Sequence, residues 1–118
     1  MKIDSKLHGI IDYLVVIFLW VSPTLFNMPE MTATFTYALG GLHLILTVFT
    51  NFEMGIFKNI PFTVHGWIEL IVSIALVGVA FYLGSIEGKF SHNFYLGSAV
   101  TIFIVWLLTN YKVRIINP

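Results

Sequence analysis

Four long apolar runs alternate with short polar connectors along the chain. The runs cover approximately residues 7–26, 35–51, 62–83 and 94–109. Each is close to the ~20 residues that an α-helix needs to cross the hydrocarbon core of a bilayer. The connectors contain Gly, Pro, Asn and charged residues, which end helices and form turns. The pattern predicts an all-α fold: an integral membrane four-helix bundle made of two transmembrane helical hairpins.

Composition agrees with a membrane protein. Hydrophobic residues make up 58% of the chain and charged residues 10%, whereas a soluble domain has about 25% charged residues. The net charge is zero without a basic block, which argues against a nucleic-acid partner. The chain has no cysteine, so disulfides, thiolate metal sites and thiol catalysis are excluded. No small-residue cleavage site precedes or follows the first run, which we expect to be a retained helix rather than a signal peptide.

Two copies of one motif indicate an internal repeat. His8-Gly9-Ile10-Ile11-Asp12 and His65-Gly66-Trp67-Ile68-Glu69 are 57 residues apart. We therefore divide a single membrane domain, residues 1–118, into a first hairpin repeat at 1–57 and a second at 58–118. Because both hairpins run in the same direction, we expect parallel repeats about an axis along the membrane normal. Further residues match at the same offset: Leu39 with Leu96, Gly40 with Gly97, and Pro61 with Pro118.

The basic residues predict the orientation of the bundle. Four spans place both termini and the middle connector on one side of the membrane. That side is cytoplasmic by the positive-inside bias, and we expect the inner membrane of a bacterium. It would hold Lys2, Lys6, Lys58, Lys112 and Arg114, against Lys89 alone on the other side.

Ionisable residues fall at one predicted depth. The four-residue spacing places His8 above Asp12 and His65 above Glu69, each pair on one helix face. At about 1.5 Å per residue, Asp12 lies ~8 Å from the cytoplasmic end of its helix, and Glu69 and His43 lie ~12 Å from theirs. Ionisable groups are costly in lipid and usually serve a function there. We predict that these five residues form a ligand- or ion-binding layer near the cytoplasmic side.

Three interpretations of this layer remain open. The polar groups could only pair and fix helix packing in a structural or accessory subunit. They could bind or pass a cation, a proton or a small polar ligand. The same residues could instead bind a transition metal or haem, as facing helices of four-helix bundles do. The cofactor is not determined by these alternatives.

Enzyme chemistry has little support in the sequence. There is no Gly-rich phosphate loop, no nucleophile elbow and no extramembrane stretch long enough for a soluble domain. We assign no catalytic residue. We expect His92 at the outer interface, too far away to join the layer, and Tyr111 in the aromatic belt at the inner interface.

The chain resembles the SPW-repeat family of small four-helix membrane proteins. The resemblance rests on Trp20-Val21-Ser22-Pro23-Thr24-Leu25-Phe26, on His8-Gly9-x-x-Asp12 and on the stretch from Ile60 to His65. Thr24 stands where the family has Trp, and Val79-Ala80 stands in place of the second Ser-Pro. The resemblance implies two copies of a helix pair and implies no activity. Ser22-Pro23 itself is expected to kink the first helix or end it.

Small residues in the third run suggest association between chains. Ala80 and Gly84 form a small-xxx-small pair, which permits close approach of helices. We predict a homo-oligomer, most simply a dimer, in the lipid bilayer.

The predicted orientation can be tested because the native chain has no cysteine. In intact cells, an impermeant thiol reagent should label the Lys89→Cys variant and leave Lys58→Cys unlabelled, since position 58 is predicted to be cytoplasmic. Labelling at 58 and not at 89 would show the opposite orientation.

Overall fold

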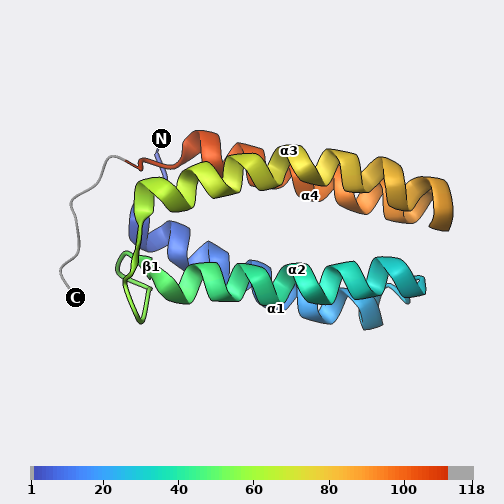
Figure 1. Cartoon of the computed structure of the whole chain (residues 1–118), viewed down its shortest axis with the longest axis horizontal. Coiled ribbons are helices and arrows are strands. Elements are labelled where there is room, and N and C mark those ends of the chain that lie inside the picture. The colour runs from blue at the N-terminus through green and yellow to red at the C-terminus, as the bar shows by residue number, and fades with distance from the viewer. Residues whose placement is uncertain (1, 112–118) are drawn as a thin grey trace.

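The computed structural model describes residues 2–111, in which four helices follow one another along the chain (Figure 1). Each helix is long and apolar enough to cross a membrane, which confirms the predicted all-helical fold at this level. Lys112, Arg114 and Pro118, which entered the orientation and repeat predictions, lie outside the described residues. The elements are α1 (Ser5–Leu25), α2 (Glu30–Phe49), β1 (Thr50–Asn51), β2 (Ile60–Pro61), α3 (Phe62–Glu87) and α4 (Lys89–Leu108).

The helices extend beyond the predicted runs at the starts of α1, α2 and α4 and at the end of α3, whereas α1, α2 and α4 end one or two residues earlier than predicted. α3 continues four residues past Leu83, and Gly88 is the single residue between it and α4. The φ angle of Gly88 is +104°, a conformation that residues with a side chain rarely adopt. At the end of α1, Pro23 lies in the last turn, and the preceding Ser22 Oγ donates a hydrogen bond to the Phe18 carbonyl at 2.5 Å. Pro23 thus precedes the helix end by two residues.

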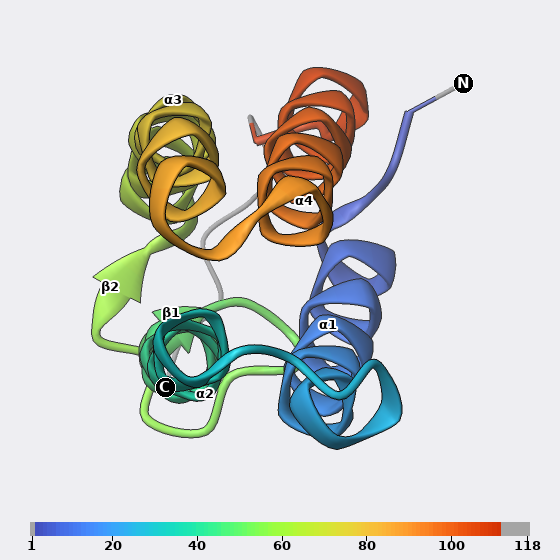
Figure 2. The ribbon, with the colours of Figure 1, turned by 90° about the vertical axis from the view of Figure 1, so that its right-hand side faces the viewer.

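The bundle consists of two hairpins. α1 packs against α2, and α3 packs against α4. Viewed along the bundle, α1 lies next to α4 and α2 next to α3, while α1 and α3 occupy opposite corners (Figure 2). Residues on α1 and α3 can therefore meet on the bundle axis.

The small-residue pair on α3 is used within the chain. Ala80 is completely buried, and a Cβ on Gly84 would lie 2.7 Å from the Cβ of His92 on α4. These residues let α3 and α4 approach each other. The homo-oligomer stays a prediction, but this pair does not support it.

The start of α1, the end of α4 and the connector between α2 and α3 lie at one end of the bundle (Figure 1). Ile3 pairs in parallel with Thr109, and Thr50 pairs in parallel with Ile60. We call the end that holds these four residues the near end, and the end that holds Gly88 the far end. The two backbone pairings connect the termini of the first hairpin to those of the second.

At the far end, side chains join α2 to the other hairpin. The Glu87 carboxylate accepts hydrogen bonds from the backbone N–H groups of Met31 and Thr32, at 2.8 and 2.6 Å, and from Thr32 Oγ1 at 2.6 Å. It thereby satisfies free donors in the first turn of α2. Since the Thr32 hydroxyl proton goes to Glu87, Ser91 Oγ donates to Thr32 Oγ1 at 2.6 Å.

Tyr95 of α4 also joins the two hairpins, through a buried hydrogen bond to α2. Its side chain is completely buried in the core formed by α3 and α4. Its hydroxyl lies 2.8 Å from Thr36 Oγ1, which itself donates to the Thr32 carbonyl. The Tyr95 hydroxyl is therefore the donor to Thr36.

We predict that Tyr95→Phe lowers the free energy of unfolding by about 1 kcal/mol, because it removes one buried hydrogen bond and keeps the ring. Equilibrium unfolding in mixed micelles measures the change. Tyr82→Phe is the matched control, since Tyr82 is 52% exposed. Equal stability of both variants would contradict a stabilising role for the Tyr95 hydroxyl.

Candidate functional site

Asp12 lies at the centre of three histidines at the near end of the bundle. It is two turns into α1, one turn after His8, so both side chains point to the bundle axis. Asp12 Oδ1 lies 3.3 Å from the Nε2 atoms of both His8 and His43, and Asp12 Oδ2 lies 3.2 Å from His65 Nε2. These contacts bring together α1, α2 and α3. Asp12 itself is 2% exposed.

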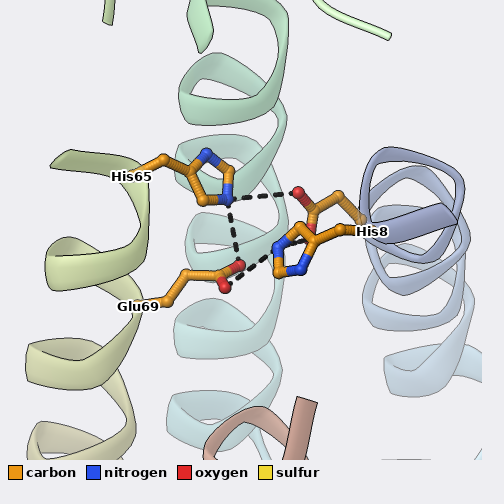
Figure 3. Close-up of side chains that lie close together, drawn as sticks. His8, His65 and Glu69 are labelled. Carbon is orange, nitrogen blue, oxygen red and sulfur yellow. Dashed lines mark ion pairs between the residues drawn. The ribbon is translucent and has the colours of Figure 1, made fainter. Parts of the chain in front are cut away.

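Glu69 occupies the corresponding place on α3 (Figure 3). Its Oε1 lies 3.0 Å from His8 Nε2 and its Oε2 lies 3.2 Å from His65 Nε2. The Tyr111 hydroxyl is a third partner and donates a hydrogen bond to Glu69 Oε1 at 3.0 Å. Burial, and then the Glu69 charge, raise the pKa of Tyr111, so the phenol keeps its proton and acts as a donor.

Two threonine hydroxyls orient the two buried imidazoles. His8 Nδ1 lies 2.8 Å from Thr109 Oγ1, and His65 Nδ1 lies 2.7 Å from Thr50 Oγ1. Each threonine donates its only hydroxyl proton to a carbonyl of the helix that it follows, Val105 for Thr109 and Leu46 for Thr50. Each threonine must therefore accept from its histidine. Both Nδ1 atoms carry a proton, and both rings present Nε2 to the carboxylates.

The Nε2 atoms and the carboxylates converge on one another. One ligand atom each from His8, Asp12, His65 and Glu69 lies within 4.8 Å of the others, and all four residues are buried. Despite the short distances, Nε2 of each of the three histidines makes no hydrogen bond of good geometry among residues 2–111, and neither does Asp12 Oδ2. The atoms face a shared centre rather than individual partners. This arrangement can hold a cation, and it can also hold protons between the rings and the carboxylates.

The structure brings together all five residues predicted from the sequence. His8, Asp12, His65 and Glu69 are buried, and His43 reaches Asp12 from α2 with 13% of its side chain exposed. His92 lies apart from them, as expected, with its Nδ1 3.3 Å from the Ala80 carbonyl and its ring against Phe81. Binding of a ligand or ion by the cluster stays a prediction.

Sequence reasoning missed three residues of the site. Tyr111 was expected in an interfacial belt, but its ring packs against Phe62, with 4.8 Å between ring centroids, and its hydroxyl contacts Glu69. Thr50 and Thr109 follow the second and fourth helices directly. A signal for them was present, because a Thr-Asn dipeptide ends both of those apolar runs.

Compared with known protein families, curated proteins and solved structures, the chain gives no match. The resemblance to the SPW-repeat family therefore stays a prediction from the sequence. The interpretation of the site depends on its geometry and chemistry.

We predict that Thr50→Val and Thr109→Val each lower the free energy of unfolding by roughly 1–3 kcal/mol, because each leaves a buried imidazole N–H without an acceptor. Chemical unfolding of the purified variants measures this effect. Thr34→Val is the control, since the exposed Thr34 hydroxyl bonds only to the Glu30 carbonyl of its own helix. A loss no larger than that of the control would show that the threonines do not hold the rings.

Proposed function

We propose that the protein is an integral protein of the bacterial inner membrane, with both termini in the cytoplasm. Large apolar side chains on the outer faces of the helices support this proposal, since they would be unfavourable in water. Examples from three helices are Leu14, Leu42 and Ile74, which are 59%, 65% and 65% exposed. Lys2, Lys6 and Lys58 belong to the near end and Lys89 to the far end, as the proposed orientation requires.

We propose further that the near-end cluster binds one divalent transition-metal cation. The observation that carries this proposal is the convergence of four buried ligand atoms from His8, Asp12, His65 and Glu69, with both Nδ1 atoms held by threonines. Imidazoles that ligate a metal almost always donate the N–H of their other ring nitrogen to a hydrogen-bond acceptor, and here a threonine oxygen takes that place. Imidazole and carboxylate ligands suit Zn²⁺, Fe²⁺, Mn²⁺ and Co²⁺.

Charge balance favours a divalent ion. With both buried imidazoles neutral, the two carboxylates give the four-residue site a charge of −2, which one divalent cation neutralises. The alternative neutral state has a proton on each Nε2. Metal binding therefore displaces up to two protons, and the affinity should rise with pH. Haem is less suitable, because Nε2 of His8 and His65 lies 3.0–3.3 Å from carboxylate oxygens, which leaves no room for a porphyrin between them.

A purely structural role is the second candidate. The contacts of Asp12 with His65 and of Glu69 with His8 join the two hairpins at the near end. Paired polar groups between membrane helices are worth roughly 1–2 kcal/mol. On this alternative the cluster would hold protons only, and no metal would bind.

Cobalt titration tests the proposal. After treatment with a chelator, the purified protein should bind one Co²⁺ per chain, with visible absorption bands of a site of low coordination number. Asp12→Asn and Glu69→Gln keep size and hydrogen bonding but remove a charged ligand. Each should weaken binding by more than about 100-fold, since loss of an outer-shell partner alone can cost 10–100-fold.

Two variants control for non-specific effects. Glu30→Gln removes an exposed carboxylate, and His92→Ala removes a histidine at the far end; both should bind Co²⁺ like the native chain. The native affinity should increase with pH as protons are displaced from Nε2. If the native chain binds no Co²⁺, or if Asp12→Asn binds it equally well, the metal proposal is wrong.

A further inference from the structure

A cavity of about 320 Å³ lies between the two hairpins, in the middle of the bundle. All four helices contribute to its lining. Its size is at the lower end of the range for small-molecule sites. The lining is mainly apolar and includes Val15, Phe18, Leu39, Val72, Phe94 and Ile102.

The cavity opens between α1 and α4. Phe18 of α1 is 45% exposed, and Gly97 and Thr101 of α4 are exposed as well as lining the cavity. A Cβ on Gly97 would meet no atom within 4 Å, so this wall leaves open space. Gly97 is about 16 Å along α4 from the near end, at a rise of ~1.5 Å per residue. In a membrane, a molecule reaches this opening from the hydrocarbon and must itself be largely apolar.

His43 is the polar group at the inner end of the cavity. It lines the main cavity and also a neighbouring pocket of about 40 Å³ that reaches Asp12 and Glu69. Two other polar side chains of the lining are already engaged, since the hydroxyls of Ser98 and Thr101 each donate to a carbonyl of α4 at 2.8 Å. The remaining polar side chains of the lining are the exposed Asn93 and His43, whose Nε2 lies 3.3 Å from Asp12 Oδ1. The other nitrogen of the His43 ring can fix one polar atom of an apolar ligand.

The aromatic lining favours a planar ligand. The rings of Phe18 and Phe94 are nearly parallel, with an interplanar angle of 12° and 6.0 Å between centroids. Both residues line the cavity. A planar ring gains from offset or edge contacts with such side chains, whereas a flexible acyl chain gains only from apolar burial.

We propose that this cavity binds a membrane-soluble ring compound of the quinone class, with a carbonyl or hydroxyl oxygen at His43 and the ring beside Phe18 and Phe94. The ligand enters from the bilayer between α1 and α4. The proposal does not require a bound metal, because neither His8 nor His65 lines the cavity, although His43 also contacts Asp12.

Retention of a short-chain quinone tests this site. The full chain in nanodiscs of fixed phospholipid composition is incubated with ubiquinone-1, and the quinone retained is measured against empty nanodiscs. We expect saturable binding of one quinone per chain. Gly97→Leu places a side chain in the cavity and should weaken binding about tenfold or more. Gly78→Leu is the matched control, since Gly78 on α3 also has open space at its Cβ but does not line the cavity.

Two further measurements keep the test decisive. If Gly97→Leu does not fold, Val72→Phe fills the same cavity from α3 and should have the same effect. The Gly97→Leu variant should still bind Co²⁺ if the native chain does, which separates failure of this site from failure of the metal site. No saturable quinone binding by the native chain, or equal binding by Gly97→Leu and Gly78→Leu, would overturn the proposal. A stoichiometric phospholipid displaced by Gly97→Leu, with no quinone binding, would show that an acyl chain fills the cavity.

Discussion

The need to compensate buried charge governs the near end of the bundle. Asp12 and Glu69 are withdrawn from water, and an uncompensated buried carboxylate costs several kcal/mol. Each carboxylate also contacts a histidine of the other hairpin, since Asp12 contacts His65 and Glu69 contacts His8. The two hairpins must therefore meet in one register. The polar residues act as a constraint on assembly as well as a candidate site.

The two ends of the bundle meet this constraint through different helices. At the near end, α1 and α3 approach through their histidines, whose ring centroids are 5.3 Å apart. At the far end, α2 and α4 approach through Thr36 and Tyr95. The hairpins thus contact each other at both ends through polar groups, and the cavity lies between these contacts. Polar pairing holds the hairpins together at the two ends of the bundle, whereas the apolar side chains in the middle leave a cavity.

The cluster was predictable because local geometry determines most of it. Helical spacing places His8 with Asp12 and His65 with Glu69, and depth along the helix adds His43. The threonines were missed because they do not follow the 57-residue offset of the motifs. Thr50 and Thr109 are 59 residues apart, because two more residues separate His65 from Thr109 than separate His8 from Thr50. The hydrogen-bonded pair Thr36 and Tyr95 has the same separation of 59 residues.

A single offset also paired residues in different environments. Gly40 and Gly97 match at 57 residues, yet a Cβ on Gly40 would lie 2.6 Å from the Trp20 ring, whereas one on Gly97 would meet open space. The position of Tyr111 could not be predicted from composition, because an aromatic residue after a span is typical of the membrane interface. Its contact with Glu69 joins residues that are 42 positions apart in sequence, so it depends on tertiary packing rather than on a local pattern.

His43 connects the buried cluster to the apolar cavity. One nitrogen of its ring lies 3.3 Å from Asp12, while the ring also lines the cavity. A ligand that hydrogen-bonds to this imidazole would alter its contact with Asp12, and with it the charge that a cation at the cluster experiences. Because coupling between two sites is reciprocal, a cation held by Asp12 would change the affinity of the cavity by the same factor. The position 57 residues after His43 is Val100, so the second hairpin has no equivalent histidine and this connection is made by the first hairpin.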